Sequence, residues 1–513
     1  MKKKVFLKNT LILTVTSLIL RTIGIFFRIY LSDKIGAEGM GLYQLIISVY
    51  VLGSTFAVAG ISTAVTRLVA DELVCGTARS VRHILRRSVA LSGMIGVVST
   101  AIIYFGAPYI AAGWLKDERA TEALKMLSFS LPSMGISSCI KGYFTARRRV
   151  GCSSRAQIVE QIVRIGLLFI TIDRFAFFGL AAACFAVMLA DTVAEWVSCL
   201  YVAVGYAIDR RRLKRETAGI PPHTRRVPVV RQLLSIATPI TAGRYLNTAL
   251  RTVENILVPN NIARYCGSRE TGLSQFGALK GMALPLLFFP ASFLSAMSTL
   301  LIPELSAANA EHQQGAIQRA VEKTLRVTFA SAMLIGGIFT AFAEPIGVLF
   351  YDSREVGVFL RVLAPLIPIM YAESMVDGML KGLNQQVSSL KYSVADSAVR
   401  IVLILLVVPY HGMAGFLFIM VVSNVLTSFL NLNRLLTVTK VKFRFLRMIG
   451  LPLLAVLVAS AVALGITQCF DTLSPLMTTV VGGVCLSVVY GVFLLLCGCH
   501  FPLDMCKKKR YDG

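Results

Sequence analysis

Four arginines lie inside strongly hydrophobic segments, in two pairs with the same spacing. Arg21 and Arg28 lie in one segment, and Arg244 and Arg251 lie in another. A spacing of seven residues is nearly two turns of α-helix, so the members of a pair share one face, about 10 Å apart along the axis. Arginine presents fixed, planar donors that suit phosphate and carboxylate oxygens. The two pairs therefore predict a binding site for an anionic ligand.

The position of these arginines within apolar segments is energetically costly. A charged side chain in the core of a bilayer usually faces the interior of a helix bundle or a water-filled cavity. We expect Arg21 and Arg244 near the middle of the membrane, as the main ligand contacts. Arg28 and Arg251 are expected in the outer halves of their helices, where either ligand contact or snorkelling to the interface is compatible with the sequence.

The composition predicts an all-α polytopic membrane protein. The 513 residues are 56% hydrophobic and 15% charged, whereas soluble domains have about 25% charged residues. The mean hydropathy is +0.71. Apolar stretches near the ~20 residues that cross a bilayer recur along the chain. They predict about fourteen transmembrane helices, at 10–31, 42–66, 88–111, 123–144, 155–172, 177–206, 232–257, 276–301, 325–350, 359–381, 390–409, 413–435, 448–469 and 475–498.

The first apolar segment and the basic residues define the orientation. The first segment continues through Arg21 and Arg28 without a small-residue cleavage site, so it is predicted to be a membrane helix and not a signal peptide. Basic runs such as 79–87, 147–149 and 210–226 fall in alternate connectors. By the positive-inside rule, both termini are predicted to be cytoplasmic. The net charge of +25 is thus explained by connectors that meet anionic lipid, and nucleic acid is excluded as a partner.

Connectors and metal-ligating residue types add little chemistry. The stretch 207–231 reads as a linker between halves, and 67–87 and 302–324 read as surface or interfacial helices. The eleven cysteines are scattered and the five histidines lie in separate segments, so neither disulfides nor a metal site is expected.

An internal repeat relates the two halves of the chain. Lys-Gly begins a similar segment at Lys141 and at Lys381, and each segment ends in an acid, two residues and Val-Arg-Ile, at Arg164 and Arg400. Helices one to six then map onto seven to twelve as a parallel pseudo-twofold repeat. Two six-helix lobes and two extra helices are expected, over 1–228, 229–445 and 446–513. Such lobes suit alternating access to a site between them.

Six acidic residues also lie within the predicted spans. They are Asp191, Glu195, Glu254, Glu373, Asp377 and Asp396. Glu254 is expected to form a local ion pair with Arg251, and Asp396 to pair with Arg400 as Glu160 does with Arg164. The like-charged pairs, Asp191 with Glu195 and Glu373 with Asp377, are candidates for coupling to Na⁺ or H⁺. Asp377 has an alternative contact in Lys381.

A known family shares the first of these motifs. The pattern R-x-x-G-x-x-x-R followed by G-x-x-G-x-G-L-Y runs from Arg21 to Tyr43, and PLLFFPASFLSAMSTLLIPELSAA follows from Pro285. The chain resembles the stage V sporulation protein B group of bacterial membrane proteins. This group belongs to the multidrug/oligosaccharidyl-lipid/polysaccharide (MOP) exporter superfamily, with the MurJ-type lipid II flippases.

The resemblance implies a MATE-like fold in the bacterial cytoplasmic membrane. It implies a flippase for undecaprenyl-pyrophosphate-linked saccharides, serving peptidoglycan, polysaccharide or other cell-wall synthesis, including that of sporulation. By the family's motifs, basic groups of helices one, two and eight line the cavity, here Arg21, Arg28, Arg67 and Lys280. The last two helices would hold the lipid tail. The expected partners are the lipid-linked saccharide, membrane lipids and envelope-synthesis proteins, with the chain itself monomeric.

Other activities fit the sequence less well. No Walker A motif, nucleophile elbow or zinc-enzyme spacing occurs, so the chain is not expected to be an enzyme or to carry a cofactor. A Na⁺ or H⁺ gradient or the membrane potential would drive transport. One alternative is a cation-coupled multidrug exporter of the same fold, although its cationic substrates would be repelled by the arginines. Another is a non-transporting membrane scaffold for envelope synthesis.

Overall fold

The computed structural model describes residues 2–58, 60–75, 78–216, 229–441, 443–469 and 474–497. Within these ranges every regular element is a helix, as predicted. Part of the predicted linker (217–228) and the basic tail (498–513) lie outside the described residues.

The helices of the first half are α1 (Lys2–Val58), α2 (Ile61–Cys75), α3 (Ala78–Tyr109), η1 (Ile110–Leu115), α4 (Ala120–Ser128), α5 (Leu131–Ala146), α6 (Gly151–Ala176) and α7 (Leu180–Glu216). The next helices along the chain are α8 (Val229–Cys266), α9 (Arg269–Phe276), η2 (Gly277–Ala283), α10 (Leu284–Phe288), α11 (Ala291–Ala310), α12 (Gln314–Ala341) and α13 (Ala343–Tyr351). The remainder are α14 (Arg354–Leu363), η3 (Ala364–Leu366), α15 (Ile367–Gly382), α16 (Gln386–Thr439), η4 (Leu446–Gly450), α17 (Leu451–Gln468) and α18 (Pro475–Leu496).

These elements account for the predicted fourteen passes. The backbone leaves the helical region at Gly36 within α1 and at Gly412 within α16, so each of these long runs consists of two helices. Conversely, α4 with α5, α9 through α11, and α14 with α15 each follow one predicted span. Eight helical runs among the described residues are long and apolar enough to cross a membrane by themselves.

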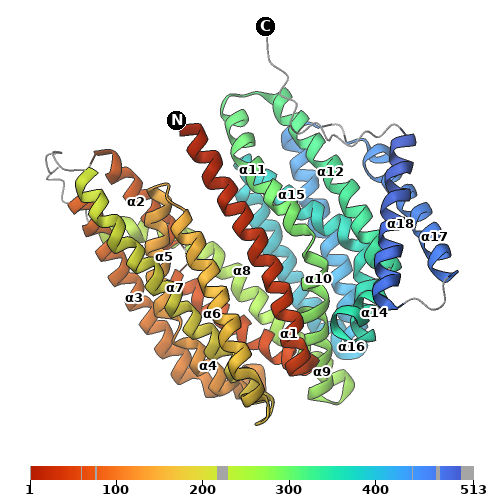
Figure 1. The fold of residues 1–513 in the computed structure, drawn as a ribbon, viewed down its shortest axis with the longest axis horizontal. Helices are drawn as coiled ribbons and strands as arrows, with labels where there is room; N and C mark the ends of the chain where they lie inside the picture. The colour runs from red at the N-terminus through yellow and green to blue at the C-terminus, as the bar shows by residue number, and fades with distance from the viewer. Residues whose placement is uncertain are drawn as a thin grey trace, which may run out of the picture. The chain divides into compact units, whose positions relative to one another are not determined.

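The chain packs as two compact units. Unit 1 comprises 1–285 with 393–419, and unit 2 comprises 286–392 with 420–513. In unit 1, α6 packs along α7, and α5 packs against α2 and α3 (Figure 1). In unit 2, α17 packs against α18, and α12 packs against α15 and α17 (Figure 1). These units do not coincide with the predicted lobes 1–228 and 229–445, because α8, α9 and part of α16 pack in unit 1; the lobes stay a prediction from the repeat.

Polar contacts explain why α8 packs in unit 1. The Thr252 hydroxyl donates to the Ser48 carbonyl at 3.1 Å, and the Asn255 amide donates to the Ser48 hydroxyl at 2.9 Å. Near the start of α8, Gly60 lies against the backbone of Ala237. The contacts pair Ser48 with Thr252, and Gly60 with Ala237, so the partners on α8 come earlier in the chain as the residues after Gly36 come later. The helix α8 therefore runs antiparallel to the second helix of α1.

Four turns at one end of unit 1 each contain a glycine. Gly36, Gly179, Gly267 and Gly412 all have positive φ, a conformation that glycine adopts without strain. Each joins two successive passes. Gly39, beside the first turn, lies against Leu180, beside the second, and Gly412 lies against Tyr265, beside the third. The first turn also lies near the third, since Gly41 lies against Leu273. The four turns therefore share one end of unit 1, which we call the glycine end.

The glycine motif after the first turn is explained by close backbone approach. A Cβ atom added at Gly41 would lie 2.1 Å from the Leu273 carbonyl oxygen. A Cβ atom added at Gly277 would lie 1.9 Å from the Ala37 carbonyl oxygen and 2.5 Å from the Gly41 nitrogen. Only glycine at both positions allows η2 to lie directly on the second helix of α1.

The internal repeat is visible in local geometry. A Cβ atom at Gly142 would meet the Ser62 carbonyl at 2.7 Å, and one at Gly382 would meet the Ile302 carbonyl at 3.0 Å. The same 240-residue offset separates the two glycines and their two partners. Each half thus uses the same close contact after its Lys-Gly pair.

We expect Gly277→Ala to destabilise the protein by about 1–3 kcal/mol, because the added methyl meets backbone atoms that cannot rotate away. Thermal unfolding of the purified protein in detergent measures this. Gly24→Ala is the matched control, since nothing lies within 4 Å of a Cβ there. The control should be neutral or slightly stabilising. Equal melting temperatures for the two variants would contradict the close-contact argument.

Candidate functional site

Four charged residues from three segments form a compact group in unit 1. Arg400 on α16 lies 3.4 Å from both oxygens of Glu254 on α8, and Lys280 on η2 lies 3.4 Å from one of them. Arg400 also donates to Asp396 at 2.6 Å. These residues, named here the Glu254 cluster, carry two positive and two negative formal charges. The cluster is therefore neutral overall, which lowers the cost of burying its members.

The backbone around Lys280 is unusual. Lys280 lies in η2, a π-helical segment, and such segments are often found at functional sites. Gly277 fixes η2 against α1, and the Lys280 ammonium lies 5.8 Å from the centre of the Phe416 ring. The side chain of Glu254 is buried, whereas those of Lys280 and Arg400 are 22% and 20% exposed. The two cations are thus partly accessible while the shared carboxylate is not.

A second ion group lies between α6 and α7. Arg164 contacts Asp191 at 2.5 Å and Glu160 at 3.1 Å. The expected pair of Arg164 with Glu160 is confirmed. The sequence does not predict the contact with Asp191, because it does not show which residues of α6 and α7 face each other. Asp191 is therefore an ion-pair partner in this structure. Glu195, one turn further along α7, interacts electrostatically with Glu160 and Lys141.

Several expected pairings can now be judged. The Asp396–Arg400 pair is confirmed. The prediction that Glu254 pairs with Arg251 is wrong: Glu254 lies on the buried face of α8 with Lys280 and Arg400, while Arg251 is exposed.

In unit 2, Asp377 contacts Lys381 at 2.5 Å, as its alternative interpretation predicted, and accepts a hydrogen bond from Ser389. Glu373 accepts one from Ser428 at 3.5 Å.

The remaining predicted basic residues have no counter-ion in the part of the chain that the structure describes. Among the described residues, no ion pair or side-chain hydrogen bond involves any of five arginines. These are Arg21, Arg67, Arg244 and Arg251, which are exposed, and Arg28, which is partly buried. These positive charges on α1, α2 and α8 are therefore not neutralised by the described chain, and they are available to an external anion.

The turns at the glycine end allow the positions of the four arginines along their helices to be compared. Arg21 lies fifteen residues before Gly36, and Arg251 lies sixteen before Gly267. At 1.5 Å per residue both are about 22–24 Å from their turns. Arg28 is eight residues from its turn and Arg244 is twenty-three from its own. By this count Arg21 and Arg251 lie at similar distances from their turns, whereas Arg244 lies farther from its own. The expectation that Arg21 and Arg244 lie near the middle of the membrane stays a prediction.

The ion groups lie at the same depth. Glu254 is thirteen residues before Gly267 and Lys280 thirteen after it, while Arg400 is twelve before Gly412. Arg164 and Asp191 are fifteen and twelve residues from Gly179. With Arg21 and Arg251, these residues form a charged layer about 18–24 Å from the glycine end. Arg67, thirty-one residues past Gly36, lies outside this layer.

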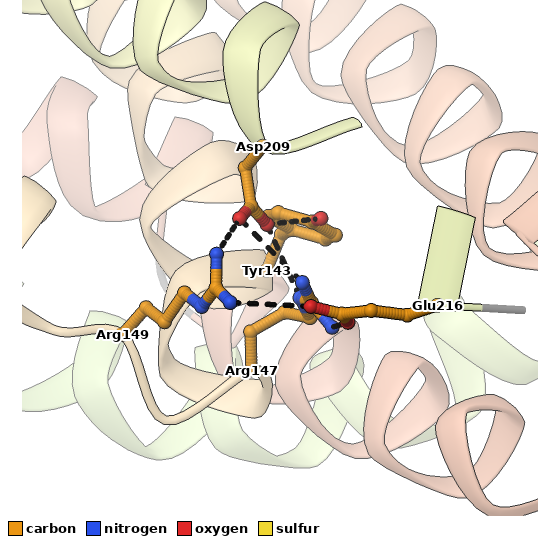
Figure 2. A network of polar contacts seen from close by, with 5 residues as sticks. All are labelled: Tyr143, Arg147, Arg149, Asp209 and Glu216. Atoms are coloured by element: carbon orange, nitrogen blue, oxygen red, sulfur yellow. Dashed lines mark hydrogen bonds and ion pairs between the residues drawn. The ribbon is translucent and has the colours of Figure 1, made fainter. Parts of the chain in front are cut away.

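A third network lies at the opposite end of unit 1 (Figure 2). Asp209 accepts hydrogen bonds from Tyr143 at 2.7 Å and from Arg147 at 3.1 Å, and it also pairs with Arg149. Both arginines also reach Glu216, at 2.8 Å and 3.3 Å. Partial burial acts to lower the pKa of Arg147, but its bonds with Glu216 and Asp209 outweigh this effect and raise the pKa. This network joins the α5–α6 connector to the last turns of α7.

Residue types that bind metals are dispersed in the described part of the chain. No three histidine, cysteine, aspartate or glutamate side chains there are grouped so that they could hold an ion.

Comparison with known proteins places this geometry in a family. A family model described as polysaccharide biosynthesis protein matches residues 6–309. The chain is 27% identical over 433 residues to stage V sporulation protein B of Bacillus subtilis (strain 168), covering 84% of this chain and 83% of that protein. It is 28% identical over 167 residues to the lipid II flippase MurJ of the same organism, covering 31% of each chain.

Solved structures agree on the fold. The inward closed conformation of lipid II flippase MurJ superposes with a TM-score of 0.67 at 13% identity, covering 94% of this chain and 98% of that one. An inward-facing multidrug resistance MATE family transporter of the MOP superfamily gives 0.65 at 16% identity, covering 82% and 94%. The predicted MATE-like, multi-pass membrane fold is confirmed.

The network of Figure 2 yields a stability prediction. Asp209→Asn should destabilise the protein by roughly 3 kcal/mol or more, because it removes the buried partner of two arginines. Glu216→Gln is the matched control: it faces the same arginines but is half exposed, so its loss should cost less than about 1 kcal/mol. Denaturant unfolding in detergent measures both. Equal losses would show that burial of Asp209 does not determine the strength of the network.

Proposed function

The chain belongs to the polysaccharide biosynthesis protein family, and on this premise we propose that it is a flippase for an undecaprenyl-pyrophosphate-linked saccharide. It would move a peptidoglycan or polysaccharide precursor across the bacterial cytoplasmic membrane by alternating access. The observation that carries this proposal is the set of arginines in the long helices that have no counter-ion among the described residues.

The chemistry of the headgroup matches these arginines. A diphosphate carries about two negative charges, and moving an isolated charge into hydrocarbon costs tens of kcal/mol in the ideal case. Charge-assisted, bidentate hydrogen bonds from guanidinium groups replace the lost hydration. Such bonds need donors that are not already paired, and Arg21 and Arg251 meet this requirement in the charged layer.

The depths of the arginines support a path for the headgroup and not a single contact. Arg28 lies nearest the glycine end, Arg21 and Arg251 lie in the charged layer, and Arg244 lies deeper. Successive positions differ by about 10–12 Å along the helix axes. We propose that the diphosphate moves between these levels while the saccharide stays in water.

The lipid tail would remain in the bilayer along the last two helices. Leu454 and Leu457 on α17 and Val484 and Val488 on α18 are all more than half exposed. These two helices pack against each other in unit 2 and present apolar side chains outward. An apolar surface of this kind suits a prenyl chain, as the last two helices of the family would.

The cellular setting follows from the same proposal. Both termini would be cytoplasmic, so the glycine end would face outward. The chain would act as a monomer without a cofactor and without chemical change to its cargo. A Na⁺ or H⁺ gradient or the membrane potential would supply the energy, and sporulation is one proposed context, given the sporulation proteins among its relatives.

The multidrug-exporter alternative shares the fold but fits the charges less well. Cations are the expected cargo of such an exporter, and the arginines without counter-ions would repel them.

We expect Arg21→Ala and Arg251→Ala each to reduce flipping at least tenfold, because each removes an unpaired cation from the charged layer. Reconstituted proteoliposomes with a defined undecaprenyl-pyrophosphate-linked saccharide measure the rate. Arg21→Lys should retain part of the activity, since it keeps the charge but loses the bidentate geometry.

The control for this experiment is Arg354→Ala. Arg354 is highly exposed at the start of α14 and makes only a long contact of 3.8 Å with Glu344. Its loss should leave the flipping rate unchanged. Wild-type rates for both Arg21→Ala and Arg251→Ala would refute the proposed role of the arginines.

A further inference from the structure

We infer that Glu254 is an internal counter-anion, which holds Lys280 and Arg400 in the empty protein and is displaced from them by the diphosphate of the cargo. The inference rests on the proposed function, because it takes a diphosphate as the ligand. It adds a second anion site to the unpaired arginines, and it gives Glu254 a role other than ion coupling.

The distances favour an exchangeable contact. Charge-assisted N–H···O bonds are usually about 2.7–2.9 Å long. The bond from Arg400 to Asp396 is slightly shorter than this, at 2.6 Å, whereas the contacts of Arg400 with Glu254 are 3.4 Å long. Lys280 also contacts Glu254 at 3.4 Å. Asp396 is therefore the more tightly bound partner of Arg400, and Glu254 is a more weakly bound anion that two cations share.

The cations Lys280 and Arg400 are more exposed than the carboxylate of Glu254, as an exchange of anions requires. Glu254 is buried, so an incoming cation has little access to its oxygens. Lys280 and Arg400 are each about one fifth exposed, so an anion can approach them without unfolding the site. A diphosphate offers more charge and more acceptor oxygens than one carboxylate. It can therefore replace Glu254 at both cations.

The displaced carboxylate has a second cation on its own helix. Arg251 lies three residues before Glu254 on α8, a spacing at which side chains meet, and it has no ion pair among the described residues. When the diphosphate leaves Arg251 for Lys280 and Arg400, Glu254 can turn to Arg251. The anions then exchange partners, and Lys280, Arg400 and Arg251 each have an anion after the exchange.

The π-helical segment supplies the geometry for this exchange. Gly277 and Gly41 bring η2 into backbone contact with α1, which fixes the position of Lys280 relative to α8. The Lys280 ammonium also lies over the Phe416 ring, 5.8 Å from its centre, where the ring attracts it. A cation held from two sides keeps its place while its anion changes.

Binding of farnesyl diphosphate to the purified protein in nanodiscs tests the inference. Glu254→Gln should bind it at least tenfold more tightly than wild type, because the competing anion is gone. Lys280→Met should bind it at least tenfold more weakly. The matched control is Asp191→Asn, which neutralises another buried carboxylate, paired with Arg164 in the same layer, and should change the affinity less than twofold.

A second comparison protects the test against poor folding of Glu254→Gln. In the Lys280→Met background, adding Glu254→Gln removes both members of a pair, and it should restore part of the lost affinity. Unchanged or weaker binding in both Glu254→Gln comparisons would overturn the inference. Equal tightening by Asp191→Asn would also overturn it, since any lost negative charge would then suffice. The flippase proposal fails separately, if Arg21→Ala and Arg251→Ala flip the saccharide at wild-type rates.

Discussion

The structure depends on one constraint: charges placed deep in apolar helices must be neutralised within the protein or by a ligand. Both solutions occur at the same depth of unit 1. Arg164 is held by Glu160 and Asp191, and Arg400 by Asp396 and Glu254. At that same depth Arg21 and Arg251 have no partner among the described residues. The contrast separates cations that hold helices together from cations that can receive a ligand.

Close backbone packing makes this arrangement possible. The turns at Gly36, Gly179, Gly267 and Gly412 align the ends of eight passes, and the register of every charged residue follows from its distance to a turn. Gly41 and Gly277 then bring η2 onto α1. The glycine motif near the first turn thus determines where Lys280 meets Glu254, although Lys280 lies more than two hundred positions further along the chain.

The sequence predicted the helical class, the fourteen passes and the local i,i+4 pairs, because these depend on composition and on spacing within one helix. It could not predict contacts between helices. Asp191 was grouped with Glu195 by spacing, yet its partner Arg164 lies on another helix. Glu254 was assigned to Arg251 for the same reason, although burial directs it to Lys280 and Arg400. Equal spacing within the two arginine pairs also does not determine how far each arginine lies from the end of its helix.

These errors have a common physical origin, and it bears on function. Spacing along one helix fixes which residues share a face, but burial of that face decides which partner neutralises a charge. The repeat predicts similar halves, and the ion groups show how far they differ. Arg164 is bound by two acids alone, whereas Glu254 in the other half is shared by two cations at longer distances. The first arrangement is suited to hold two helices together. In the second, two cations hold their shared carboxylate at long distances, near arginines that have no counter-ion among the described residues. A more highly charged anion can exchange with the carboxylate under these conditions.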